Sequence, residues 1–176
     1  KTLMKIGYTL NSAMADIIDN SMAAGASFVN IYSPPGRSEP YISILDDGCG
    51  MNAAELTQNM RIGCKDPSED RSGGDLGRFG SGMKTASFSQ ARRLTVISRK
   101  KGYPITAARW DIDRIEETNS WSLEVFEEAE LNEIEEMSAE FPRDSGTQII
   151  WSNLTCIDKG SHAQDQDIEL SSSLSE

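Results

Sequence analysis

Asp16 and Asn20 are two polar side chains, four residues apart in an apolar-periodic stretch, that together could act on a metal-bound phosphate. At that spacing both project from neighbouring points of one helix face. The carboxylate of Asp16 can accept a proton from an attacking water or orient that water. The amide oxygen of Asn20 is the hard type of ligand that Mg²⁺ prefers. An exposed polar helix face has the same residues, so the pair alone decides nothing.

A second motif, Asp46-Asp-Gly-Cys-Gly50, directly follows the apolar run Ile42-Ser-Ile-Leu45. A carboxylate at a strand end, here that of Asp46, can accept a hydrogen bond from the exocyclic amine of adenine. Gly48 and Gly50 lack side chains, so the backbone can turn sharply and approach a flat ring. An ordinary acidic turn has a similar composition, and both interpretations stay open for this motif by itself.

A third motif, Gly77-Arg-Phe-Gly-Ser-Gly82, opens a helix that continues through Lys84. Backbone N–H groups at a glycine-rich helix N-terminus form an anion site, and Lys84, expected in the first turn, adds a positive charge for a terminal phosphate. Near the end, Ser145-Gly-Thr147 precedes an apolar strand, where Thr147 can hydrogen-bond a base edge or a bridging water. Each motif is weak alone, but their order and spacing predict one nucleotide pocket.

Hydrophobic periodicity and turn residues predict the elements that position these motifs. We expect a helix over Tyr8–Ala24 and a helix through Met60 that Asn52 begins with a capping box to Glu55. The polar segment 61–75 is expected to be a mobile lid. Further elements are expected at the following ranges: strands 28–32, 41–45, 92–98, 105–112, 121–126 and 148–151, and a helix over 80–90. This order predicts a two-layer α/β (α+β) sandwich, with a mixed, mostly antiparallel sheet and helices on one face.

Composition narrows the class of protein. The chain has 176 residues, 38% hydrophobic and 26% charged, which suits one globular domain. Of the net charge of −11, the whole excess lies between Asp111 and Asp144, which hold 13 acids and 2 bases. That acidity argues against nucleic-acid binding by this domain alone. Three cysteines without a CxxC pair suit a reducing cytoplasm, no apolar run is long enough for a membrane, and one histidine disfavours zinc and Ser-His-Asp chemistry.

Together the motifs resemble the GHKL superfamily of ATPases, from about Tyr8 to Trp151, and most of all its MORC and heat-shock-chaperone-like bacterial members. The resemblance implies the Bergerat fold, which binds ATP with Mg²⁺ beneath a lid. It also implies an ATP-binding domain at residues 1–160. The polar tail 161–176 is expected to be frayed or to lead into an absent transducer domain.

Carried over to this chain, the resemblance implies that Asn20 holds Mg²⁺ and that Asp46 recognises adenine with help from Thr147 through water. Gly48 and Gly50 would shape the floor of the base site. The remaining nucleotide contacts, mostly around the phosphates, would come from Met51, Gly77, Phe79, Gly80, Ser81, Gly82, Met83 and Lys84. Hydrolysing members usually carry Glu where this chain has Asp16. Because Asp is one methylene shorter, we expect ATP binding to survive and hydrolysis with Asp16 as base to be slow.

Three functions are compatible with this pocket. The first is an ATP-driven switch, in which lid closure and a nucleotide-dependent homodimer follow ATP binding. The second is a regulatory module that binds ATP without hydrolysing it. The third, a histidine-kinase catalytic domain, needs a phosphoacceptor histidine in a helical hairpin, and the one histidine, His162, lies in the polar tail. A protein client or DNA would be reached only through absent domains, and no membrane is expected to be involved.

Overall fold

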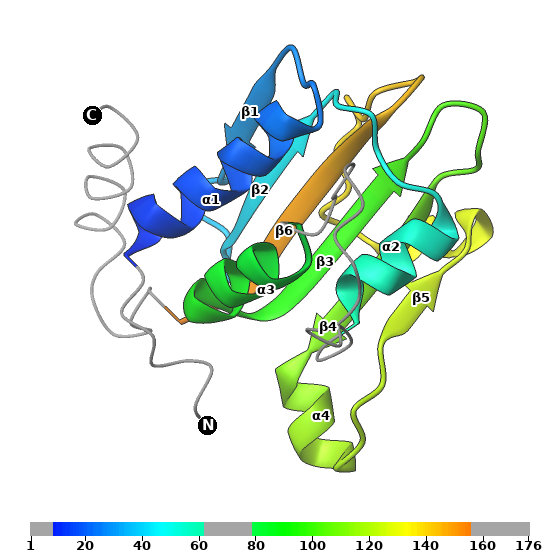
Figure 1. Cartoon of the computed structure of the whole chain (residues 1–176). Helices are drawn as coiled ribbons and strands as arrows, with labels where there is room; N and C mark the ends of the chain where they lie inside the picture. Colours follow the sequence, from blue (N-terminus) through cyan, green and yellow to red (C-terminus); the bar gives the residue numbers. More distant parts are fainter. Residues whose placement is uncertain (1–8, 62–78, 156–176) are drawn as a thin grey trace, which may run out of the picture.

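The computed structural model of this chain describes residues 9–61 and 79–155 (Figure 1). The segment expected to form the lid, apart from Arg61, lies outside the described residues, as do Gly77 and the polar tail. Every other predicted site residue lies within them. The described part folds into a single sheet with helices packed on it.

The sheet has six strands in the spatial order β1-β2-β6-β3-β4-β5, and each neighbouring pair is antiparallel. The strands are β1 (Val29–Tyr32), β2 (Tyr41–Asp46), β3 (Ala91–Arg99), β4 (Thr106–Asp111), β5 (Glu124–Phe126) and β6 (Gly146–Leu154). The last strand is therefore inserted at the centre, between β2 and β3. This insertion brings the start of β6 beside the end of β2, where the second and fourth motifs meet.

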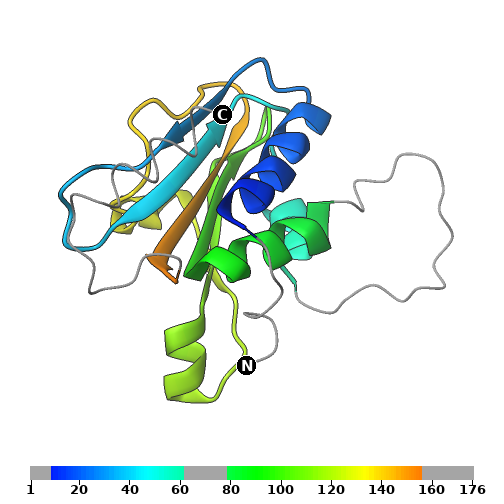
Figure 2. The ribbon, with the colours of Figure 1, turned by 90° about the vertical axis from the view of Figure 1, so that its left-hand side faces the viewer.

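Three helices cover one face of the sheet, as Figure 2 shows. They are α1 (Leu10–Ala23), α2 (Ala53–Met60) and α3 (Phe79–Gln90). The 3-10 helix η3 (Glu128–Glu133) lies on the opposite face, and α4 (Ile112–Thr118) extends from the end of β4. The predicted α/β sandwich with helices on one face is thus confirmed. None of the described helices has the length and apolarity that a membrane span requires.

Local sequence signals account for the helix starts. Thr9 caps α1 by accepting a hydrogen bond from the Ser12 N–H at 3.1 Å. The capping box predicted for α2 is present, because the Asn52 side chain accepts from the Glu55 N–H and the Glu55 carboxylate accepts from the Asn52 N–H, both at 3.0 Å. Each such cap stabilises a helix by about 1 kcal/mol. α2 therefore begins where the sequence predicts, whereas α1 begins at Leu10, two residues later than the predicted start at Tyr8.

Alternating strand residues build two separate cores, one on each face of the sheet. The core under α1, α2 and α3 contains Leu94, Val96 and Trp151, whereas Ile97 and Ile150 face the opposite core with η3. Two tryptophans also tie helices to the sheet. The Trp151 Nε1–H donates to Ser87 Oγ in α3 at 2.8 Å, and the Trp110 Nε1–H donates to the carbonyl oxygen of Met60 in α2 at 2.7 Å. The helices that carry the motifs are therefore fixed to the central strands.

The secondary structure of the acidic stretch, residues 111–144, differs from the prediction. The strand expected to continue to Ile112 ends at Asp111, whose carboxylate accepts from the N–H groups of Asp113 and Arg114 and so begins α4, which the sequence did not predict. The strand expected from Trp121 begins only at Glu124, and the Trp121 side chain is 63% exposed. The first difference arises because Asp111 caps a helix and so ends the strand before Ile112.

Candidate nucleotide site

Asp46 is a buried carboxylate at the end of β2, with 6% of its surface exposed. Its Oδ2 accepts a hydrogen bond from the Ser21 hydroxyl in α1 at 2.7 Å, and its Oδ1 accepts from the Gly48 N–H at 2.9 Å. Burial raises the pKa of Asp46 above its ordinary value, and these hydrogen bonds only partly offset that effect. The side chain is therefore a fixed acceptor held between α1 and the sheet, as base recognition would require.

Asp47, the next residue, points the other way. Its carboxylate accepts hydrogen bonds from the Ser27 N–H at 2.7 Å, from the Phe28 N–H at 3.0 Å and from the Ser27 hydroxyl. These hydrogen bonds, first of all that of the Ser27 hydroxyl, lower the pKa of Asp47. Successive residues of an extended segment face opposite sides, so one Asp of the motif faces the helices and the other closes the turn between α1 and β1.

Close packing leaves no room for a side chain at either of the two motif glycines. A Cβ added to Gly48 would lie 2.8 Å from the Cβ of Ala24, just beyond the end of α1. Gly50 has φ of +62°, and a Cβ added to it would lie 1.8 Å from the carbonyl oxygen of Arg99. The turn after β2 is thus pressed against α1 on one side and β3 on the other. This packing fixes the conformation of the turn.

We expect Gly50→Ala to destabilise the fold severely, because the new methyl group would overlap the Arg99 carbonyl in a backbone conformation that already disfavours Ala. Gly102→Ala is the matched control, since Gly102 has φ of +83° and open space around its missing Cβ. Urea denaturation measures the free energy of unfolding of both variants. We expect Gly102→Ala to lower it by about 1 kcal/mol, and Gly50→Ala to lower it several-fold more. Equal losses in the two variants would contradict the packing argument.

Thr147 lies directly opposite Asp46 in the β2–β6 pair, and Ser98 lies directly opposite Thr147 in the β3–β6 pair. The hydroxyl oxygens of Ser98 and Thr147 are 2.9 Å apart, and Ser98 Oγ also accepts from the Met51 N–H at 2.9 Å. Asp46, Thr147 and Ser98 thus form a row across three adjacent strands. The structure brings the second and fourth motifs together as predicted, and it adds Ser21 and Ser98, which the sequence did not single out.

Asp16 and Asn20 lie on α1, and both are partly exposed. Asn20 directly precedes Ser21, the residue whose hydroxyl donates to Asp46, so Asn20 lies one residue from that contact. Neither side chain has a hydrogen-bond partner within the described ranges, 9–61 and 79–155. The described residues contain no cluster of three or more His, Cys, Asp or Glu that could hold a metal alone. A single amide fits Mg²⁺ bound mainly by phosphate oxygens and water.

Helix α3 begins at Phe79, so Gly80, Ser81 and Gly82 lie in its first turn. A Cβ added to Gly82 would meet no atom within 4 Å, which leaves room beside that turn. Met83 is 4% exposed and packs in the core, so only its backbone can reach a ligand. Lys84 lies in the second turn, one turn later than expected. Its Nζ donates to the carbonyl oxygens of Asn59, at 3.0 Å, and Arg61 near the end of α2.

The model of one protein family, described as histidine kinase-, DNA gyrase B- and HSP90-like ATPase, matches residues 8–147. The chain belongs to this family of ATPases. The match covers all four motifs and ends at Thr147. Membership confirms the resemblance to the GHKL superfamily and agrees with the six-stranded antiparallel sheet and its helices. ATP binding and hydrolysis are the general activities of this ATPase family.

Curated relatives lie in two branches of the superfamily. The chain is 22% identical over 183 residues to human ATPase MORC2, which covers 86% of this chain and 18% of that protein. It is 29% identical over 91 residues to Caenorhabditis elegans ATPase morc-1, covering 52% of this chain and 10% of the relative. To the DNA mismatch repair protein MutL of Halobacterium salinarum it is 29% identical over 106 residues, covering 58% and 16%. The chain therefore spans less than a fifth of each relative.

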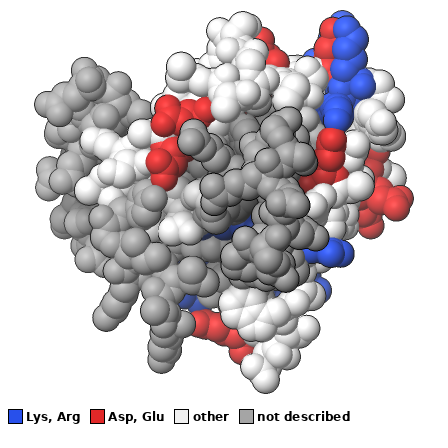
Figure 3. All heavy atoms as spheres, viewed as in Figure 1, with Lys and Arg blue, Asp and Glu red and all other residues white. Residues whose placement is uncertain are grey.

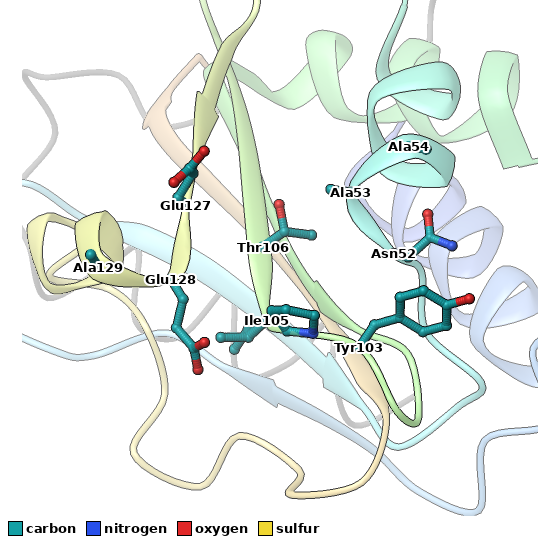
Figure 4. Close-up of a pocket in the computed structure, with 10 residues that line it drawn as sticks. Asn52, Ala53, Ala54, Tyr103, Ile105, Thr106, Glu127, Glu128 and Ala129 are labelled. Carbon is teal, nitrogen blue, oxygen red and sulfur yellow. The ribbon is translucent and has the colours of Figure 1, made fainter.

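A separate cavity of about 600 Å³ lies between the start of α2 and the segment that joins β5 to η3 (Figure 4). Tyr103 and Asn52 lie on one side, Glu127 and Glu128 on the other, and Ile105 lies between them. None of the residues predicted for this ATPase site lines it. On the helix-covered face, acidic and basic side chains stand side by side at the rim rather than in one basic patch (Figure 3).

Proposed function

We propose that this chain is an ATP-binding domain that hydrolyses ATP slowly with Mg²⁺ and uses the nucleotide to switch conformation. The observation that carries the proposal is the buried Asp46 carboxylate, which Ser21 and Gly48 hold at the end of β2, beside α1. A buried carboxylate is costly unless it is hydrogen-bonded. A role in binding would explain why the chain keeps this carboxylate buried: it would accept a hydrogen bond from the exocyclic amine of adenine.

The adenine base would lie against the turn formed by Gly48 and Gly50, with its amine donating to Asp46. Thr147 would complete the recognition of the base edge, directly or through water, because it is the residue opposite Asp46 in the sheet. Buried, pre-positioned acceptors discriminate strongly against a base that lacks the matching donor. The site is therefore expected to prefer ATP over GTP.

The phosphates would extend from the base toward the first turn of α3, where backbone N–H groups favour an anion. Asn20 would hold Mg²⁺, which when bound neutralises charge on the phosphate oxygens. Lys84 would add its charge after leaving the carbonyl oxygens of Asn59 and Arg61. Because the hydrogen bonds of Lys84 hold the last turn of α2, phosphate binding would then be coupled to the position of α2.

For hydrolysis, Asp16 would accept a proton from water as the water oxygen bonds to the γ-phosphorus. The bond between that phosphorus and the oxygen bridging to the β-phosphate breaks, and ADP and inorganic phosphate result. The Asp16 carboxylate reaches one methylene less far than Glu, so the proton transfer is expected to be slow. This shorter reach also supports the second candidate, a regulatory module that binds ATP without turning it over.

The conformational part of the proposal rests on the sequence. Closure of the segment 61–75 over the phosphates, followed by assembly of two copies, would require ATP to bind the closed state more tightly than the open one. Equilibrium sedimentation with and without a non-hydrolysable ATP analogue measures the assembly. A monomer under both conditions would remove the dimer from the proposal while leaving the nucleotide site intact.

Titration calorimetry with ATP and Mg²⁺ tests the binding step, and release of inorganic phosphate tests the chemical step. We expect saturable binding of ATP, weaker binding of GTP and slow release of phosphate. Binding of ATP with no release of phosphate would favour the non-hydrolysing module. No uptake of ATP at millimolar concentration would contradict both candidates.

Burial raises the pKa of Asp46. We therefore expect ATP affinity to be lost on acidification at a higher pH than the ordinary pKa of an aspartate would predict. The ionised carboxylate accepts the amine, so affinity is full above the raised pKa and is lost as the pH falls through it. In the nucleotide-free chain the raised pKa makes protonation of Asp46 favour the folded state, so this group does not itself cause acid unfolding. Calorimetry across the acidic range, with circular dichroism to follow the fold, measures both. A pH-independent affinity would contradict the role of Asp46.

A further inference from the structure

The hydroxyl group of Ser98 joins three separate segments at the base end of the site. Its oxygen lies 2.9 Å from the Met51 N–H nitrogen, 2.9 Å from Thr147 Oγ1 and 3.1 Å from the carbonyl oxygen of Gly146. Ser98 itself is fully buried near the end of β3. One hydroxyl thus connects β3 with the turn after β2 and with the start of β6.

The hydrogen positions in this group follow from counting donors. A hydroxyl has one hydrogen and can accept two hydrogen bonds. The Gly146 carbonyl oxygen can only accept, so its contact with Ser98 is favourable only if Ser98 donates to it. Ser98 then accepts from the Met51 N–H and from the Thr147 hydroxyl. All three contacts are satisfied only in this arrangement, which holds the Thr147 hydroxyl in one orientation.

We infer that Ser98 is a positioning residue for recognition of the base: it fixes the Thr147 hydroxyl and the Met51 backbone on either side of the adenine edge. The inference rests on the proposed nucleotide site. Asp46, Thr147 and Ser98 lie in register across β2, β6 and β3, on the face that the helices cover. Ser98 touches no base in this scheme, and its effect passes through its two partners.

The decisive variant is Ser98→Ala, with Ser98→Thr as the form that keeps the hydroxyl. Ser152→Ala is the matched control, because Ser152 is also a buried serine in the central strands, and among the described residues its Oγ has no hydrogen-bond partner. We expect Ser98→Ala to weaken ATP binding about tenfold, from loss of one ordered hydrogen-bond group. We expect Ser98→Thr to remain within about threefold of the wild type, and Ser152→Ala to bind ATP as the wild type does.

A double-mutant cycle with Thr147→Val separates positioning from general stability. If Ser98 acts through Thr147, Ser98→Ala costs much less than tenfold once the Thr147 hydroxyl is gone. Inosine triphosphate, which carries a carbonyl in place of the adenine amine, is expected to show a smaller effect of Ser98→Ala than ATP does. Additive losses in the cycle, or an equal loss for both nucleotides, would overturn the inference.

The measurement is titration calorimetry on the whole chain, with thermal unfolding of each variant as a control for folding. If Ser98→Ala does not fold, Ser98→Cys keeps the branching of the side chain and replaces the hydroxyl by a slightly larger thiol that is a weaker donor, and we expect it to lose ATP affinity as well. Wild-type affinity in a folded Ser98→Cys variant would then overturn the inference. If the wild type binds no ATP, the proposed function fails. If the wild type binds ATP and Ser98→Ala binds it equally well, only the role of Ser98 fails.

Discussion

Asp46→Asn is expected to weaken ATP binding by at least about 100-fold, or about 2.7 kcal/mol. The Asn side chain keeps the shape of the carboxylate but presents an NH₂ group where one acceptor oxygen was. The Gly48 N–H still requires an oxygen, so the NH₂ group replaces the oxygen that faces Ser21, and the Ser21 hydroxyl must change from donor to acceptor. A donor at that position cannot accept the adenine amine. Loss of a charged acceptor adds to that cost. Titration calorimetry with ATP and Mg²⁺ at neutral pH gives the dissociation constants.

Asp47→Asn is the matched control for this effect. Asp47 is the adjacent carboxylate of the same motif, but it bonds to Ser27 and Phe28 in the turn before β1. We expect this variant to bind ATP within about threefold of the wild type, because the Asp47 side chain faces the turn before β1 and has none of the contacts that hold Asp46. Equal losses in Asp46→Asn and Asp47→Asn would show that the motif supports the fold rather than the base.

Asp16→Asn is expected to lower the rate of ATP hydrolysis about 100-fold or more while leaving ATP affinity nearly unchanged. A positioned general base contributes roughly 10²- to 10⁴-fold, and an amide cannot take the proton from water. Asp16 is partly exposed on α1 and forms no hydrogen bond that the fold needs within the described residues. Phosphate release at saturating ATP measures the rate, and calorimetry measures the affinity.

Asp19→Asn is the control on the same helix, since Asp19 is exposed and three residues away. We expect its turnover to equal that of the wild type. Asp16→Glu restores the residue that hydrolysing members of the superfamily usually carry, and we expect it to raise turnover roughly tenfold by bringing the carboxylate closer to the water. Unchanged turnover in Asp16→Asn, with ATP bound, would remove Asp16 as the base.

Local sequence patterns were sufficient to predict much of the architecture. The capping box at Asn52 and Glu55 fixed the start of α2, because both partners lie within one turn of sequence. The apolar run before Asp46 placed that carboxylate at a strand end, since strands of this kind end at Asp-Gly turns. Order and spacing of motifs then sufficed to identify the superfamily.

Long-range contacts explain what the sequence did not predict. Ser21 and Ser98 look like ordinary polar residues in apolar elements, and their partners, Asp46 and Thr147, lie 25 and 49 residues away. The only local sign was the position of Ser21 beside Asn20 on the buried side of α1. Lys84 was expected near a phosphate, but its contacts with the end of α2 depend on how two helices pack.

The acidic stretch illustrates the same limit in another way. Its many glutamates are typical of a solvent-exposed face, and much of it is exposed. Leu131 and Ile134 within it are buried nonetheless, and they form the second core with Ile97 and Ile150 from the central strands. A few apolar residues spaced among many glutamates were enough to cover the second face of the sheet, because each contributes about 1.5–3 kcal/mol on burial.

The most direct test of the account is a crystal structure of this domain with a non-hydrolysable ATP analogue and Mg²⁺. The account predicts the adenine amine within hydrogen-bond distance of the Asp46 carboxylate, and the metal bound by the Asn20 side-chain oxygen and by phosphate oxygens. A nucleotide that binds elsewhere, or that lies in this site with its base away from Asp46, would contradict it.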